Sequence, residues 1–321
     1  MIWRTVFALA SRGGPRGRLS ILTFHRVRAR PDPLFPFEMD AAAFESLIRQ
    51  LRSRFTVVRL AEGVQRLRDR TLPSRALAIT FDDGYADNLA IAAPILQKHQ
   101  VPATVFVASG YLDGGCMFND IVIEAIRATR SSELDLEPLG LGRHPVESAE
   151  ARRRAIDHVL DGIKYQPGGE RDRLAREIAR IANADIPTAL MLGRESLRAL
   201  PTFDLDVGAH TITHPILTRT TAEEARHEIG DSRRVLEALM QTPVTLFAYP
   251  NGVPNRDYDA THVRMVREAG FVAAVSTATG AARAESDLFQ LPRFTPWTSR
   301  SPKFDLLMLR NLSRRNELRA A

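Results

Sequence analysis

Short apolar runs alternate with amphipathic helical patterns along most of this chain. The apolar runs are typical of buried strands and cover residues 19–24, 76–81, 103–107, 205–209, 244–249 and 271–276. Between many of them, apolar residues recur at helical spacing, as over residues 41–52, 88–99, 120–129 and 221–240. Thr221 and Glu224 match a capping box at the start of the last helix. The alternation predicts a parallel sheet with helices outside it, either open or closed into a barrel.

The alternation is interrupted between about residues 131 and 199, where no strand is evident. Residues 148–160 and 171–182 form charged, arginine-rich helical patterns in this interval. We interpret 131–199 as a helical insertion into a single domain of residues 19–300, because the motifs on both sides of it belong to one site. Residues 301–321 are expected to form a C-terminal helical tail.

The N-terminal segment, residues 1–18, contains an apolar run from Ile2 to Ala10 that Arg4 interrupts. The run is too short to span a bilayer and lacks the charged leader of a signal peptide. We expect either a short helix packed on the domain or an interfacial helix that contacts a membrane peripherally, with basic residues behind it. On these grounds we expect a chain that is cytoplasmic or peripheral to the inner face of the membrane.

Charge and cysteine content exclude some kinds of site. The formal net charge is +6, with arginine spread along the whole chain, whereas a nucleic-acid-binding surface would be a dense basic patch. We therefore expect no nucleic-acid partner, although a mildly basic surface would suit an acidic polysaccharide or an anionic membrane. The single cysteine, Cys116, excludes an intramolecular disulfide and a thiolate metal cluster. The oligomeric state is not indicated.

Two adjacent carboxylates, Asp82 and Asp83, directly follow the apolar run 76–81 and precede Gly84. In a βα barrel, catalytic groups lie at the carboxyl ends of the strands, where the loops enclose the pocket. Like charges this close raise each other's pKa, and a cation bound to one carboxylate relieves the conflict and leaves the other as a base. A solvated turn is the alternative. Asp87 and Asn88 are expected to cap the next helix.

Two histidines, His210 and His214, stand four residues apart just after the run 205–209. One helical turn would place both imidazoles on the same side of the chain, although Pro215 favours a turn over a continuing helix. Imidazole and carboxylate together suit zinc and other late divalent transition metals. Two histidines and one aspartate would also leave coordination positions open for water and substrate. Alone, the His-x-x-x-His pattern also occurs by coincidence on helix surfaces.

Taken together, these two segments resemble the paired motifs of the polysaccharide deacetylase family, also called the NodB-homology domain or carbohydrate esterase family 4. The motifs are Thr-Phe-Asp-Asp-Gly at 80–84 and His-Thr-x-x-His-Pro at 210–215. Further matches are Leu-Thr-Phe-His-Arg-Val at 22–27, Pro-Ala-Thr-Val-Phe-Val at 102–107, Phe-Ala-Tyr-Pro-Asn-Gly at 247–252 and Leu-Pro-Arg-Phe at 291–294. The resemblance covers residues 20–297, and the helical insertion is its least typical part.

The resemblance implies a distorted (β/α)7 barrel and a role for each motif residue. Asp82 would be the general base, and Asp83, His210 and His214 would hold one divalent ion, with zinc expected and cobalt or nickel as alternatives. The segment of Tyr249, Pro250 and Asn251 would contact the substrate, and the backbone amide of Asn251 would stabilise the oxyanion.

The chain departs from the usual family pattern in two places. The arginine that usually precedes the third-motif proline is missing from Phe-Ala-Tyr-Pro, and the usual last-motif histidine, the catalytic acid, is replaced by Arg293. Both departures occur together in the Phe-Ala-Tyr-Pro subgroup. Our hypothesis is that Arg293 orients the base and that His25 is the acid. The alternative for His25 is a core histidine that bonds to the backbone.

The function that follows from the resemblance is removal of N-acetyl groups, with release of acetate, from a polysaccharide or a sugar-containing oligomer. Such a hydrolase would act on an N-acetylated glycan in exopolysaccharide or cell-envelope metabolism. One alternative keeps the barrel but acts on a small amide or cyclic imide. Another is a carbohydrate-binding relative with weak catalysis, which the missing acid histidine favours and the intact Asp82 disfavours.

Overall fold

A parallel sheet forms the centre of the molecule in the computed structural model, which describes residues 2–296, 298, 301–314 and 318–321. Within these residues, seven strands follow the order β1-β5-β6-β9-β10-β11-β12, and β4 pairs with β5. Leu22 of β1 bridges Phe294 just after β12, so the sheet nearly closes into a barrel. The predicted (β/α)7 barrel is therefore confirmed. The strands are β1 Ser20–Phe24, β4 Thr56–Val57, β5 Ala76–Phe81, β6 Ala103–Val107, β9 Leu205–Ala209, β10 Leu246–Ala248, β11 Ala273–Thr279 and β12 Leu291–Arg293.

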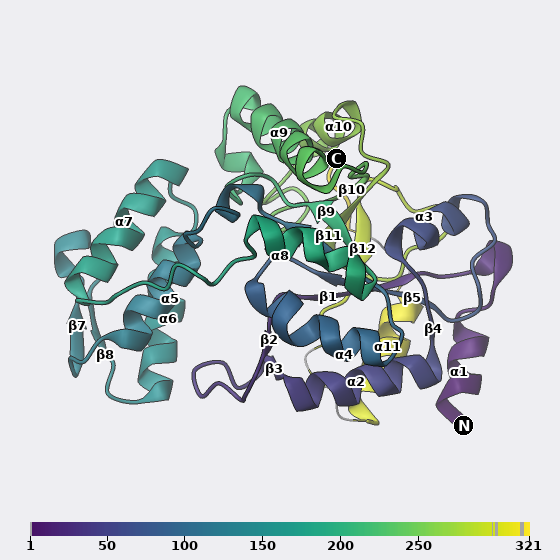
Figure 1. The fold of residues 1–321 in the computed structure, drawn as a ribbon, viewed down its shortest axis with the longest axis horizontal. Coiled ribbons are helices and arrows are strands. Elements are labelled where there is room, and N and C mark those ends of the chain that lie inside the picture. The colour runs from purple at the N-terminus through teal and green to yellow at the C-terminus, as the bar shows by residue number, and fades with distance from the viewer. Residues whose placement is uncertain (1, 297, 299–300, 315–317) are drawn as a thin grey trace.

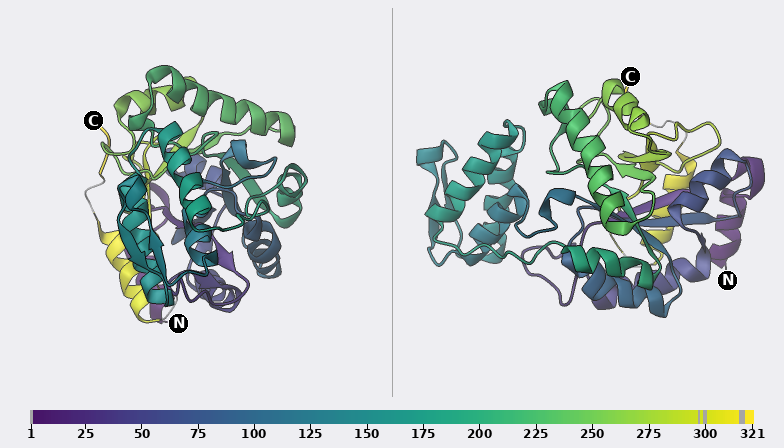
Figure 2. Two further views of the ribbon diagram at one scale, coloured as in Figure 1. Left: turned by 90° about the vertical axis from the view of Figure 1, so that its left-hand side faces the viewer. Right: turned by 45° about the horizontal axis from the view of Figure 1, so that its top comes forward.

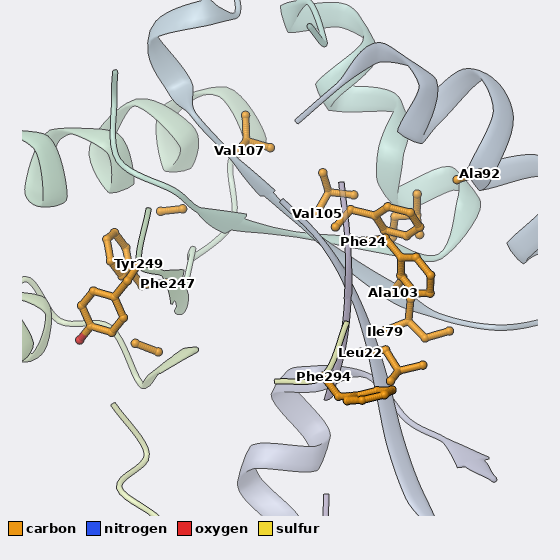
Figure 3. Packing of buried hydrophobic residues seen from close by; sticks show 14 of the residues in the cluster. Leu22, Phe24, Ile79, Ala92, Ala103, Val105, Val107, Phe247, Tyr249 and Phe294 are labelled. Atoms are coloured by element: carbon orange, nitrogen blue, oxygen red, sulfur yellow. The ribbon is translucent and has the colours of Figure 1, made fainter. Parts of the chain in front are cut away.

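The barrel strands are buried on both faces, which explains why they are nearly continuous apolar runs. Alternate residues point to opposite faces, so Ile21 and Ala78 enter one apolar cluster together with Val275. Their neighbours Leu22 and Ile79 enter the larger cluster that packs under the helices. Figure 3 shows side chains of this larger cluster.

Helices surround the barrel and cover the outward face of its strands (Figure 1). The capping box of Thr221 and Glu224 forms at the start of α9, as predicted. The helix expected over 88–99 begins as a π-helical turn, Asn88–Ala92, and Pro94, which has no N–H to donate, lies in the first turn of the α-helix that follows. The helices are α1 Ile2–Ala10, α2 Ala41–Arg54, α3 Leu60–Arg68, α4 Ala93–Lys98, α5 Phe118–Ala128, α6 Ala149–Ile163, α7 Gly168–Ile181, α8 Arg194–Ala199, α9 Ala222–Met240, α10 Ala260–Glu268 and α11 Lys303–Ser313.

The insertion projects to one side of the barrel and has an apolar core of its own (Figures 1 and 2). It begins earlier than predicted, because Val122 and Ile126 of α5 pack into that core with α6 and α7. In contrast, Leu197 of α8 packs into the main cluster of the barrel. The expectation that the interval holds no strand is also wrong. β7 Glu133–Asp135 and β8 Arg143–Pro145 form an antiparallel hairpin there. A second small pair, β2 Val27–Arg28 and β3 Met39–Asp40, follows β1.

The first and last helices of the chain pack beside each other on the barrel, where α1 contacts α11 and α2. Phe7 of α1 is fully buried, and its ring centroid lies 4.5 Å from that of Phe55. The same helix leaves Ile2 78% and Leu9 66% exposed. α11 covers the junction of β1 and β12, with Phe304 buried. Among the described residues, no helix has the length and apolar character needed to cross a bilayer.

Candidate active site

Asp82 and Asp83 lie where β5 ends, and a turn directs their side chains to different partners. The backbone of Asp83 has φ 76°, in the left-handed region that residues with a side chain rarely adopt. Gly84 follows with φ 83°, and a Cβ there would lie 3.1 Å from the Val107 side chain. Both carboxylates are nearly buried. The strained turn therefore presents two adjacent aspartates to opposite sides of one site.

The Asp83 carboxylate meets both histidines of the second motif. Its Oδ1 lies 3.4 Å from Nε2 of His210 and 3.4 Å from Nε2 of His214. One ligand atom from each of the three residues lies within 4.8 Å of the others, and Asp83 Oδ1 is buried without a hydrogen-bond partner among the described residues. A carboxylate and two imidazoles that converge in this way fit one divalent ion.

The protonation of the two imidazoles also suits metal binding. His210 Nδ1 lies 2.7 Å from the carbonyl oxygen of Ala248, which can only accept, so Nδ1 carries the proton and Nε2 keeps its lone pair for a metal. Burial opposes protonation of His210, but the negative charges of Asp83 and Asp82 outweigh it and raise its pKa. Burial lowers the pKa of His214 to about 3, which keeps that ring neutral.

The loop that carries the two histidines is held by Glu228, a residue that the sequence reading missed. Its carboxylate, on α9, accepts hydrogen bonds from the backbone N–H of Ile212 at 2.7 Å and of Thr213 at 2.9 Å, and from the Thr213 hydroxyl at 2.6 Å. The loop needs this support because His214 has φ 55°. The signal in the sequence was a carboxylate one residue before Ile229, on the mainly apolar buried face of α9.

Arg293 forms a bidentate ion pair with Asp82, with both N–O distances at 2.6 Å. Its Nε also donates to the carbonyl oxygen of Ser276 at 2.9 Å, which fixes the plane of the guanidinium. Both side chains are almost fully buried. Burial alone would raise the pKa of Asp82, but the adjacent Arg293 charge keeps it below the usual range. Asp82 is thus an ionised, oriented carboxylate, which a general base must be.

His25 follows β1 and is exposed, which contradicts the alternative of a core histidine. Its positive charge, when present, lowers the pKa of both Asp82 and Asp83, so the ring lies near the two carboxylates. Asn88 Nδ2 donates to the backbone carbonyl of His25 at 2.9 Å and so fixes the backbone at His25. The expectation that Asp87 and Asn88 cap a helix is wrong, since Asp87 instead pairs with Arg26 at 2.7 Å.

The third motif, residues 247–252, contributes backbone groups more than side chains to the site. Tyr249 is fully buried beside Phe247 (Figure 3), and its hydroxyl donates to Phe289 O at 3.0 Å. A substrate contact by the Tyr249 side chain is therefore excluded, which corrects that part of the prediction. After Pro250, Asn251 adopts φ 57°, and its N–H has no acceptor among the described residues. That N–H is available to a ligand.

A second buried polar group, Tyr85 with Asp120, borders the carboxylates, and no sequence motif indicates it. The Tyr85 hydroxyl donates to Asp120 at 3.0 Å, and the Arg26 guanidinium lies 4.5 Å from the centre of the Tyr85 ring. Asp120 comes from α5, so the insertion reaches the edge of the site. Burial raises the pKa of Asp120 to about 7, and the negative charge of Asp83 adds to the effect.

Comparison with known proteins agrees with this fold. The curated protein YxkH of Bacillus subtilis strain 168, named as a polysaccharide deacetylase, is 20% identical over 70% of this chain, which spans about half (53%) of that relative's length. The Streptococcus pyogenes deacetylase PplD, in complex with acetate, superposes with a TM-score of 0.62 at 17% identity and covers 92% of this chain and 99% of its own. IcaB from Ammonifex degensii gives a TM-score of 0.58 at 16% identity, over 95% of this chain and 99% of its own.

Sequence similarity to the family itself extends over both metal motifs. The sequence model for polysaccharide deacetylase matches residues 69–135 and 167–274, which is more than half of the chain. The stretch between the two matched segments, 136–166, falls inside the insertion. This chain belongs to the polysaccharide deacetylase family.

Proposed function

We propose that this chain is a metal-dependent hydrolase that removes N-acetyl groups from a polysaccharide or a sugar-containing oligomer and releases acetate. The observation that carries the proposal is the convergence of Asp83, His210 and His214 beside an aspartate, Asp82, that Arg293 keeps ionised. A site for one divalent ion next to an ionised carboxylate is suited to hydrolysis of an unactivated amide. Zinc suits the donor set best, with cobalt and nickel as alternatives.

The protein's own residues divide the work as follows. A divalent ion held by Asp83, His210 and His214 supplies Lewis acidity toward water and the acetamide carbonyl. Asp82 accepts the proton of the attacking water, and Arg293 keeps the receiving oxygen in place. The N–H of Asn251 donates to the carbonyl oxygen as negative charge develops on it. His25 then gives a proton to the departing sugar nitrogen, so that an amine leaves instead of an amide anion.

Acetate release from N-acetylglucosamine oligomers tests the proposal. We expect zinc-dependent release that a chelator abolishes and that falls by at least 100-fold in Asp82→Asn, the loss typical of a missing general base. Asp204→Asn is the matched control, because Asp204 precedes β9 at the end of the strand opposite His210. Turnover of small amides without any glycan activity would overturn the substrate class, and glycan binding without acetate release under zinc, cobalt and nickel would overturn the catalytic role.

We also propose peripheral contact with a membrane through α1. Its support is the exposure of Ile2 and Leu9 on a helix that Phe7 anchors to the barrel. The exposed Arg12 and Arg16, which follow the helix, would pair with anionic headgroups. Co-sedimentation with anionic vesicles should fall in an Ile2→Ser/Leu9→Ser double variant, and unchanged sedimentation would remove this part of the proposal.

A further inference from the structure

A polar cavity of about 370 Å³ lies between α11 and the ends of β1, β11 and β12. Its walls include Thr23, Thr277, Arg293, Arg310, Asn311 and Arg314. The volume falls in the range of small-ligand sites, roughly 300–1,000 Å³. Thr23 and Arg293 belong to motifs described above, whereas the residues that α11 and β11 contribute to the cavity lie outside those motifs.

Two polar atoms of buried wall residues have no hydrogen-bond partner among the described residues. Thr23 is 2% exposed and its Oγ1 is unpaired, and Asn311 is 1% exposed with an unpaired Oδ1. The Asn311 orientation is fixed, because its Nδ2 donates to the carbonyl oxygen of Gly280 at 3.0 Å. Oδ1 is therefore left as an acceptor. Buried polar groups are usually hydrogen-bonded, so both atoms indicate a ligand with hydroxyl groups.

The cavity is also positively charged. Arg310 of α11 and Arg314, the residue just after that helix, are exposed, and their side chains form no ion pair or hydrogen bond within the described part of the chain. Of the residues that the structure describes, no carboxylate lines the cavity. Arg293 adds no net charge, because it is paired with Asp82. Two guanidinium groups without an ion-pair partner among the described residues favour binding of an anion. The geometry of guanidinium matches both carboxylate and phosphate.

The cavity shares two walls with the catalytic site. Arg293 lines the cavity and holds Asp82 with two bonds of 2.6 Å. Thr277 also lines it, and its hydroxyl donates to the carbonyl oxygen of Asn251 at 2.8 Å. A ligand in the cavity would thus lie next to the residues that orient the base and the oxyanion amide.

We propose that this cavity is a subsite for an acidic sugar residue of the substrate, one that carries a carboxylate or a phosphate, next to the acetylated residue. The inference rests on the deacetylase function proposed above and names its substrate class. Hydroxyl groups of the sugar satisfy Thr23 and Asn311, and its anionic group pairs with Arg310 and Arg314.

Binding of defined oligosaccharides to the full chain, without added metal so that turnover is suppressed, tests the proposal separately from activity. The probes are a neutral N-acetylglucosamine tetrasaccharide, a tetrasaccharide of alternating N-acetylglucosamine and glucuronic acid, and a phosphorylated N-acetylglucosamine tetrasaccharide. We expect at least one acidic probe to bind about tenfold more tightly than the neutral one, with salt reducing the difference. Which acidic probe binds better tells whether the subsite takes a carboxylate or a phosphate.

Variants of residues inside and outside the cavity test whether the preference for acidic probes arises there. Arg310→Gln and Arg314→Gln should each weaken acidic-probe binding about threefold, as for an exposed ion pair, and leave neutral-probe binding unchanged. Lys303→Gln removes a charge from the same helix outside the cavity and should change neither. Thr23→Val should weaken acidic-probe binding without lowering the thermal unfolding midpoint, since the hydroxyl has no partner to lose.

Equal binding of acidic and neutral probes, or a preference that survives both arginine substitutions, would overturn the subsite. Failure of the deacetylase proposal looks different. In that case no probe releases acetate when zinc is added, whatever the binding preference is.

Discussion

Replacement of Arg293 by methionine would leave Asp82 as an unpaired charge in the interior. The Arg293 side chain is 0% exposed and that of Asp82 is 4% exposed, so solvent cannot replace the lost partner. Breaking a buried ion pair on one side costs about 3–5 kcal/mol. With an unfolding entropy of about 2.1 cal/mol/K per residue, this corresponds to a fall in Tm of about 4–8 °C for a chain of this length. Because methionine keeps most of the side-chain volume of arginine, the loss of stability measures the effect of the missing charge and not that of a cavity.

The pH dependence separates a charge effect from a packing effect. The folded-state pKa of Asp82 lies below its ordinary value, so the pair stabilises the fold above the unfolded pKa and loses its effect as pH falls through the folded pKa. Without Arg293, burial raises the pKa of Asp82, and the carboxyl takes up a proton already at moderate pH. The stability difference between wild type and Arg293→Met should therefore be largest near pH 7 and shrink as pH falls.

Urea unfolding of metal-free protein at several pH values measures this difference. The double variant Arg293→Met/Asp82→Asn should regain most of the lost stability, because the unpaired charge is gone. The acidic limb of the kcat/KM profile of Arg293→Met should move to higher pH, since the base is protonated more easily. A loss below about 1 kcal/mol, or a double variant no more stable than the single one, would refute the assignment of Arg293 as the partner of the base.

Three further predictions concern residues around this pair. Asp120→Asn keeps an acceptor for the Tyr85 hydroxyl but removes a carboxyl whose pKa is raised to about 7. Between about pH 4 and pH 7 the folded wild type binds the extra proton, so its stability falls as pH rises, and urea unfolding with chelator should show a flatter dependence in the variant. Glu228→Ala should lower zinc affinity about 10- to 100-fold in a chelator competition, because it frees the histidine loop. Glu224→Ala, which removes only the capping box, should cost about 1 kcal/mol and leave zinc affinity unchanged. His25→Ala should lower kcat on an acetamide by about 100-fold or more but much less on an aryl acetate, whose leaving group needs no proton, and equal losses on both substrates would argue against an acid role.

The strands, and the convergence of the three candidate metal ligands, could be predicted because local signals determine them. Residues 76–81 form a strand as expected, since a run buried on both faces is apolar throughout. Asp83, His210 and His214 converge because parallel strands bring their carboxyl ends to one edge. The direction of the Arg293 side chain agrees with the hypothesis, although only the structure shows the bidentate pairing.

The features that were not predicted depend on tertiary contacts, which a sequence pattern does not specify. The periodicity of α5 indicates an apolar face, but it does not tell whether the barrel or the insertion covers that face. In the sequence, Glu228 cannot be told from any other helical glutamate, because its role depends on the loop that it contacts in the fold. Tyr249 sits in a catalytic motif, yet its buried ring stacks 3.8 Å from that of Tyr258 instead of facing a ligand. Positive φ at Asp83 and His214 also has no sequence signal, because neither residue is glycine.

Titration of the metal-free chain with zinc, followed by acetate release from an N-acetylglucosamine oligomer at each point, tests the central claim most directly. We predict that the rate rises linearly and saturates at one zinc per chain, and that Asp83→Asn abolishes both tight zinc binding and release. Release at an undiminished rate in the presence of excess chelator, or saturation with zinc without any acetate release, would contradict the account.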